Sequence, residues 1–386
     1  MKKSLLGFAF LAVLTSCTNT TPHSNQTFDA SEESSGEPGY YYGEFSNPLM
    51  AMTTSGSAFS GEVADPTVVR DPESGELWCF ATNRVTLKSE DGCNWIQVGG
   101  EIINFPTWHR ESGMAINPNQ IQMWAPDVVK IGKKWIYYYS LSNWGDCVGI
   151  GYGIADNIGG PYVDQGKLFS YKEIDVENAI DPQVIQTSNG EVWMTFGSFQ
   201  GVYQVQLNND GIGLMGDDID YWKENKILVA GAPTDWDCSQ YEGSYVLEHN
   251  GKYVYFGSVG TCCDGTDSTY RVMAGISNSV NGPFIDSKGM KLTMSRNGST
   301  YGNLVVWAGS ADDGDVYGPG HNSIIKDDAG DYWIYYHAYT RKDGFATRHL
   351  MMDKILWDDK GFPYVNTKKP SYDPYLDKPQ EGPKFL

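Results

Sequence analysis

Three acidic residues and one histidine occupy matching positions in five similar stretches of this 386-residue chain. Each stretch has a short β-branched segment, a polar turn with one glycine, and then an aromatic segment. We align one position three residues before the β-branched pair, and it holds Asp65, Ala125, Asp181, Glu242 and His321. Carboxyl groups gathered at one place can perform acid–base chemistry, because their surroundings can keep one protonated and another ionised.

This set of residues suits glycoside hydrolysis better than other reactions. One carboxyl group can donate a proton to the leaving oxygen while the other activates water or attacks carbon. The alternative is that these acids only cap turns, but gathering like charges costs energy and shifts their pKa values upward. The sequence contains no G-x-S-x-G, H-E-x-x-H or P-loop motif, and only six histidines.

The five stretches predict the elements that hold these residues in place. Their turns carry Gly75, Gly132, Gly190, Gly251 and Gly330, and glycine supplies the positive φ that tight hairpins need. The aromatic segments alternate with period two, as strands do. Five such hairpins predict an all-β fold, a five-bladed β-propeller over residues 41–386, with a β-sandwich as the alternative. The first strand of each blade then lies nearest the axis, and the aligned residues surround one mouth of the channel.

The tryptophans fall into two groups. Those on the second strands of the hairpins are expected in the blade cores: Trp78, Trp135, Trp193 and Trp333. Others fall in loops, where they could stack on sugars or pack against their own loop: Trp108, Trp144, Trp236 and Trp307. His109 and His337 belong to no motif and are interpreted as structural.

The net charge and the N-terminal residues restrict the possible binding partners and the cellular location of the protein. A formal charge of -20 and a pI near 4.6 make nucleic acid a poor partner and favour a neutral polymer. Residues 1–16 have the form of a signal peptide, and "LTSC" resembles a bacterial lipobox ending at Cys17. We therefore expect an exported monomer whose Cys17 carries a lipid and whose residues 17–40 form a flexible tether. The sequence leaves open which face of which membrane carries the anchor.

Six further cysteines are compatible with export but do not define a disulfide pattern. Six cysteines allow 15 pairings, and the absence of a C-x-x-C pair argues against a zinc site. The adjacent Cys262 and Cys263 leave three possibilities open: a redox device, simple packing, or a disulfide.

Several motifs together resemble glycoside hydrolase family 43, and most closely its endo-α-1,5-L-arabinanases. They are "DPTVV", "MWAPDVV", "NAIDPQV", "FGSF", "CCDGTDSTYRV" and "GPGHNSII", and they cover about residues 60–360. The resemblance implies a five-bladed propeller that inverts the anomeric carbon, with Asp65 as general base and Glu242 as general acid. Asp181 would orient the acid and raise its pKa. Inversion requires the two carboxyl groups to stand roughly 6.5–9.5 Å apart.

The same resemblance assigns residues to substrate and metal. It implies that Asn178, Ser198 and Phe199 line an arabinose subsite and that Trp124 stacks on sugar. His321 would lie near a calcium ion on the axis, although it could instead only form hydrogen bonds in the channel. The expected substrate is a neutral plant polysaccharide, arabinan, cut within the chain. The alternatives are an exo-acting α-L-arabinofuranosidase or β-xylosidase of the family, and a glycan-binding propeller without catalysis.

Two departures from the family pattern affect the detail of this prediction. Ala64 precedes Asp65 where the family often has histidine, and Glu242 lies in "EGSY" where arabinanases usually show Glu-Ala-Pro. The fold and the three acids are unaffected, but the subsites and strict arabinan specificity are left open.

Overall fold

The computed structural model describes residues 39–386, except residues 112, 234–240, 296–298, 310–313 and 374–377. The predicted signal peptide, the lipid site at Cys17 and nearly all of the tether lie outside the described residues. Residues 40–386 form one compact unit. No helix in the described part of the chain is long and apolar enough to cross a membrane.

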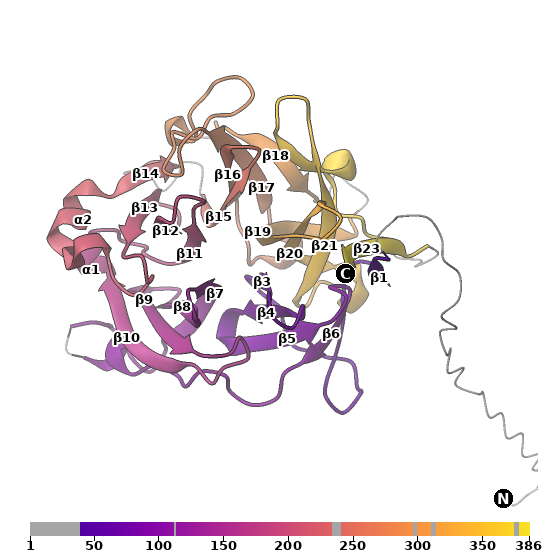
Figure 1. The fold of residues 1–386 in the computed structure, drawn as a ribbon, viewed down its shortest axis with the longest axis horizontal. Helices are drawn as coiled ribbons and strands as arrows, with labels where there is room; N and C mark the ends of the chain where they lie inside the picture. The colour runs from indigo at the N-terminus through magenta and orange to yellow at the C-terminus, as the bar shows by residue number, and fades with distance from the viewer. Residues whose placement is uncertain (1–38, 112, 234–240, 296–298, 310–313, 374–377) are drawn as a thin grey trace, which may run out of the picture. The chain divides into compact units, whose positions relative to one another are not determined.

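The compact unit is a five-bladed β-propeller, as the hairpin repeat predicted (Figure 1). Each blade is an antiparallel sheet of four consecutive strands, and the first blade gains β2 (Met50–Met52) as a parallel fifth strand beside β6. Blade 1 contains β3 (Thr67–Arg70), β4 (Leu77–Ala81), β5 (Val85–Ser89) and β6 (Asn94–Gln97). Blade 2 contains β7 (Gln122–Ile131), β8 (Lys134–Asn143), β9 (Asp146–Ala155) and β10 (Val163–Ser170).

The remaining three blades follow in chain order. Blade 3 contains β11 (Gln183–Gln186), β12 (Val192–Phe196), β13 (Val202–Leu207) and β14 (Ile227–Ala230). Blade 4 contains β15 (Glu242–His249), β16 (Lys252–Val259), β17 (Arg271–Ser277) and β18 (Asn303–Trp307). Blade 5 contains β19 (Val316–Lys326), β20 (Tyr332–Thr340), β21 (Arg348–Trp357) and β22 (Pro363–Val365). The five predicted turn glycines all have positive φ, between 60° and 92°.

The first strands of the blades surround the axis. Strand β3 contacts β7, β7 contacts β11, β11 contacts β15, β15 contacts β19, and β19 contacts β3. This closed circle places the residues just before each first strand around a common opening, as the repeat predicted.

The hydrophobic core lies between neighbouring blades, because both faces of each second strand are covered. On β4, Trp78 and Phe80 pack toward blade 2, whereas Leu77 and Cys79 pack toward blade 5. Successive side chains of a strand point to opposite faces, so one strand serves two interfaces. The four tryptophans predicted to lie in blade cores are all buried: Trp78, Trp135, Trp193 and Trp333.

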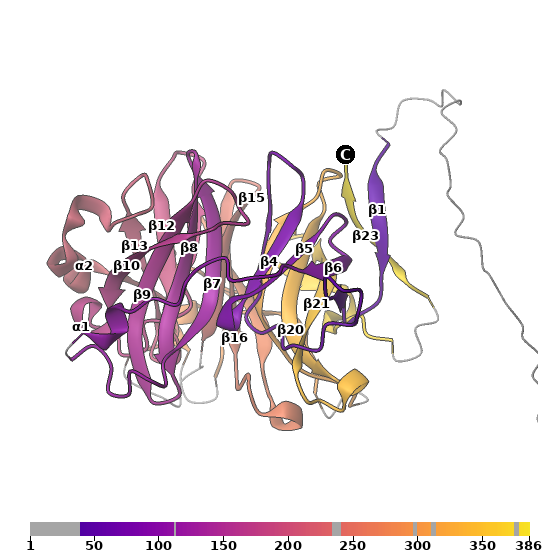
Figure 2. The ribbon, with the colours of Figure 1, turned by 90° about the horizontal axis from the view of Figure 1, so that it is seen from below.

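The two ends of the described chain pair with each other. Strand β1 (Tyr41–Phe45) runs antiparallel to β23 (Gln380–Phe385) as a separate two-stranded sheet (Figure 2). Phe45 and Phe385 pack into the cluster between blades 1 and 5. Two short helices, α1 (Tyr171–Ile174) and α2 (Ile219–Asn225), lie in the connections before and within blade 3.

Candidate active site

The repeat position before each first strand has an unusual backbone conformation. Asp65, Ala125, Asp181 and His321 all have positive φ, between 39° and 58°. In blade 4 the residue with this conformation is Gly243, at 54°, and not Glu242. The alignment that placed Glu242 at this position was therefore wrong by one residue. Glycine suits the left-handed conformation, and a Cβ atom at Gly243 would lie only 2.9 Å from His321 Cγ.

Hydrogen bonds between blades fix this conformation in four of the five blades. In each case the backbone N–H donates to a side chain from the second hairpin segment of the preceding blade. The pairs are Ala125 with Thr82 Oγ1 (2.9 Å), Asp181 with Ser140 Oγ (2.9 Å), His321 with Ser258 Oγ (2.7 Å) and Asp65 with His337 Nδ1 (3.0 Å). The backbone beneath the candidate catalytic residues is thus held by the blade interfaces.

Blade 4 departs from this pattern at the acid. The Gly243 N–H donates to Asp181 Oδ2 at 3.1 Å, and Ser198 Oγ donates instead to Glu242 Oε2 at 2.6 Å. Ser198, which follows β12, would otherwise hold the backbone of the next blade. The shift by one residue therefore links Glu242 to blade 3 through Ser198. It also places the backbone of Gly243 against Asp181.

A pocket of about 960 Å³ is lined by every site residue that the sequence predicted. Its lining includes Asp65, Trp124, Asn178, Asp181, Ser198, Phe199, Glu242 and His321. These residues come from all five blades, so only the closed propeller brings them together. Their individual roles remain predictions.

Asp65 is held as an anion by two basic side chains, His321 and Arg348, and by a threonine. Its Oδ1 lies 3.2 Å from His321 Nδ1 and 3.7 Å from Arg348 Nη1, and its Oδ2 accepts a hydrogen bond of 2.5 Å from Thr82 Oγ1. Burial alone would raise the pKa of Asp65, but the charge and hydrogen bond of His321, followed by the charge of Arg348, hold it well below its usual range. An ionised carboxylate suits a general base.

Glu242 has the opposite environment. Burial, followed by the charge of Asp181, raises the pKa of Glu242 to about 7, although Ser198 and the neighbouring Tyr270 oppose the shift. Burial also raises the pKa of Asp181 to about 6, with His321 opposing and Asp65 adding to the shift. The pKa values of Asp65 and Glu242 are thus driven apart, a pattern that is typical of paired catalytic bases and acids.

The two histidines nearest Asp65 differ in charge. Burial alone would lower the pKa of His321, but Asp65, Asp181 and Glu242 raise it to about 9. Burial and Arg348 hold the pKa of His337 well below its usual value. His337 Nδ1 accepts the Asp65 N–H, which fits a neutral imidazole with its proton on Nε2. His337 is fully buried and holds the backbone of Asp65 through this hydrogen bond.

The family model for glycosyl hydrolases family 43 matches residues 59–363. The chain belongs to this family. The matched range contains all five hairpins and every residue of the candidate site.

Two relatives of the chain carry the names of enzymes that act on α-1,5-linked arabinose chains. The chain is 27% identical over 330 residues to an extracellular exo-α-(1→5)-L-arabinofuranosidase of Cellvibrio japonicus, covering 83% of this chain and 91% of the relative. It is 28% identical over 312 residues to an extracellular endo-α-(1→5)-L-arabinanase of Bacillus subtilis, covering 78% and 86%. The structure of a Cellvibrio cellulosa α-L-arabinanase complexed with arabinohexaose superposes with a TM-score of 0.68 at 26% identity, covering 84% and 99%.

Part of this family 43 site could not be seen in the sequence. Arg348, Tyr339 and Glu62 line the pocket from blade 5 and the segment before blade 1, and no motif marked them. Cys262 and Cys263 form a disulfide in the pocket wall, whereas Cys79, Cys93 and Cys147 are free. Cys238 lies outside the described residues.

An aromatic pair extends the pocket at blade 2. Trp124 and Trp144 have ring centroids 5.3 Å apart, and Trp144 is 80% exposed. Trp124 Nε1 donates to Gln122 Oε1 at 2.8 Å, which fixes its ring. Trp144 was one of the loop tryptophans with an open interpretation, and the structure places it at the pocket rather than within its own loop.

The donors near His321 do not form a calcium cage. Calcium takes six to eight oxygen ligands, whereas no three His, Cys, Asp or Glu side chains in the described part of the chain cluster as metal ligands. His321 Nδ1 is already engaged by Asp65 Oδ1. Any ion at His321 would therefore take most of its ligands from water.

Proposed function

We propose that this protein hydrolyses α-1,5-linked L-arabinofuranose chains, cutting within the chain and inverting the anomeric carbon. The observation that carries the proposal is the opposite shift of two carboxyl groups in one pocket. Asp65 is held ionised, and the pKa of Glu242 is raised to about 7. Membership of family 43 and the names of its arabinan-degrading relatives support the substrate class.

The reaction follows from these two protonation states. Asp65 takes a proton from a water molecule, whose oxygen attacks the anomeric carbon on the face opposite the leaving group. Glu242 donates its proton to the glycosidic oxygen as that bond breaks. Asp181, which accepts the Gly243 N–H, keeps negative charge near Glu242 and favours its protonated form. Exchange with solvent then restores Asp65 to its ionised state and Glu242 to its protonated state.

Cutting within the chain requires a site that accepts sugar on both sides of the broken bond. The pocket extends from the Trp124–Trp144 pair to the disulfide and Arg348, which favours a bound segment of several sugars. The second candidate is exo cleavage, because one of the relatives bears that name.

Product sizes from linear arabinan separate these two modes. We expect a ladder of oligosaccharides at early times, with slower release from branched arabinan and little from xylan. A single small product from the first minutes onward would assign exo action. Cleavage of xylan in preference to arabinan would assign the β-xylosidase alternative, and binding without any cleavage would assign the non-catalytic one.

Two further predictions concern the ion and the membrane. We propose that a calcium ion binds beside His321 through water molecules. Metal analysis after dialysis should find calcium in the wild type and less in His321→Ala, and equal contents would contradict the site. We also propose export and attachment through a lipid on Cys17, in line with the extracellular relatives. Loss of membrane association in Cys17→Ala cells, with activity released to the soluble fraction, is the expected result.

A further inference from the structure

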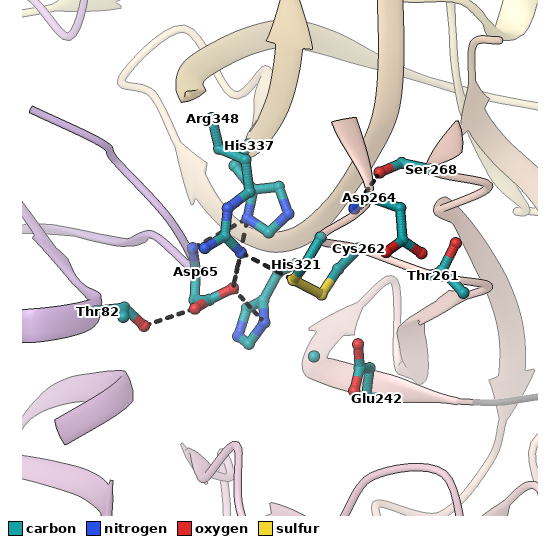
Figure 3. Close-up of a disulfide and its surroundings, with 12 residues drawn as sticks. Asp65, Thr82, Glu242, Thr261, Cys262, Asp264, Ser268, His321, His337 and Arg348 are labelled. Carbon is teal, nitrogen blue, oxygen red and sulfur yellow. Dashed lines mark hydrogen bonds and ion pairs between the residues drawn. A yellow bond between two sulfur atoms is a disulfide. The ribbon is translucent and has the colours of Figure 1, made fainter. Parts of the chain in front are cut away.

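The Cys262–Cys263 disulfide forms part of the wall of the catalytic pocket. It occupies the connection from β16 to β17, and both cysteines line the pocket with Asp65 and Glu242 (Figure 3). The connection is closed at its base, where the Thr269 and Tyr270 N–H groups both donate to Thr261 O at 3.1 Å. The disulfide thus follows directly after Thr261, the residue that closes the loop.

One arginine joins this loop to the candidate base. Arg348 Nη1 donates to Cys263 Sγ at 3.5 Å and lies 3.7 Å from Asp65 Oδ1. The rest of its guanidinium is bound to Glu62 through Nε at 2.8 Å and Nη2 at 3.1 Å. Arg348 therefore bridges blades 4 and 1 from its position on blade 5, and its Nη1 is the atom shared by the sulfur and the carboxylate.

We propose that the Cys262–Cys263 disulfide is a positioning element of the active site, which acts by holding Arg348 against Asp65. The sulfur offers Arg348 Nη1 a fixed acceptor on the side away from Glu62. Two separate thiols would rotate independently, so Nη1 would lose its fixed acceptor and only the Glu62 pair would hold the guanidinium in place. Because a small misplacement of a catalytic group costs much of the rate, we expect the intact disulfide to raise turnover.

This inference rests on the proposed hydrolase function, and a cycle of two changes tests it. Dithiothreitol supplies two electrons and two protons, which break the S–S bond and form two thiols while the reagent closes to its own cyclic disulfide. We expect reduction of the wild-type protein, verified by mass, to lower kcat about tenfold with a smaller effect on KM. In Arg348→Met the same reduction should have no further effect, because the disulfide would have lost the group through which it acts.

The matched control is Cys262→Ser/Cys263→Ser, which should resemble the reduced wild type and show no response to dithiothreitol. Unchanged kcat in reduced wild type would overturn the proposal. An equal loss in Arg348→Met would also overturn it, since the disulfide would then act on general stability. Where the double serine variant does not fold, reduction of folded wild type gives the same comparison.

A second readout does not depend on turnover. The ¹⁵N signal of Arg348 Nε, assigned with Arg348→Met, should shift when the folded protein is reduced. If the oxidised protein cleaves no arabinan, the proposed function fails, yet this signal still tests the inference. An unmoved signal would overturn the positioning role whatever the substrate proves to be.

Discussion

Asp181 Oδ2 accepts a hydrogen bond of 3.1 Å from the backbone N–H of Gly243, the residue directly after Glu242. This contact joins blade 3 to blade 4 at the point where the repeat is displaced by one residue. It keeps a carboxylate next to the candidate acid. The charge of Asp181 is the largest contribution after burial to the raised pKa of Glu242.

Asp181→Asn should therefore lower the pKa of Glu242. A general acid works only while protonated, so wild-type kcat/KM should fall as the pH rises through about 7. Without the Asp181 charge that fall should begin about one pH unit lower. The measurement is the pH profile of kcat/KM for a linear arabino-oligosaccharide, whose sugar leaving group needs the proton. If the alkaline limb of the profile stays in place in Asp181→Asn, Asp181 does not raise the pKa of Glu242.

Glu242→Gln should abolish hydrolysis of arabinan while sparing substrates that need no proton. We expect a loss of about 10²- to 10⁴-fold on natural linkages. Substrates with acidic leaving groups, such as dinitrophenyl glycosides, should recover much of the rate. The matched control is Glu248→Gln, on the same strand but exposed and hydrogen-bonded to Ser188. Equal losses on both substrate types would argue against the acid role.

Asp65→Asn should remove turnover but keep binding. Asparagine keeps the shape of the side chain but cannot take a proton from water, so we expect kcat to fall by about 10³-fold or more. Calorimetry with arabinohexaose should give a dissociation constant within a few-fold of wild type. Asp71→Asn, just beyond the other end of β3, provides the control. Retained turnover in Asp65→Asn would exclude Asp65 as base.

Trp144→Ala should affect long substrates more than short ones. The exposed Trp144 ring lies beside Trp124, and an aromatic face stabilises a bound sugar by stacking. We expect KM for arabinohexaose to rise about three- to tenfold, while kcat/KM for an aryl arabinofuranoside stays close to wild type. If the kinetic constants change equally for both substrates, Trp144 stabilises its loop and does not form a distant sugar subsite.

The sequence predicted the hairpins, which are local and repeated, and missed side-chain contacts that form only between blades. Five hairpins with turn glycines were sufficient to predict the propeller and the common mouth of Asp65, Asp181 and Glu242. The shift at Gly243 could have been read from the sequence, because Gly243 and not Glu242 stands three residues before Val246, as the aligned residues of the other blades stand before their β-branched residues. Arg348 was missed because its partners lie far away in the sequence: Cys263 comes from blade 4 and Asp65 from blade 1.

The stereochemistry of the first product tests the central claim most directly. If Asp65 activates water while Glu242 protonates the leaving oxygen, cleavage of linear α-1,5-arabinan must produce new reducing ends in the β configuration. Proton NMR of a fresh digest should show the β anomer first, followed by slow equilibration with the α anomer. Appearance of the α anomer first would contradict the direct attack by water and the roles assigned to both carboxyl groups.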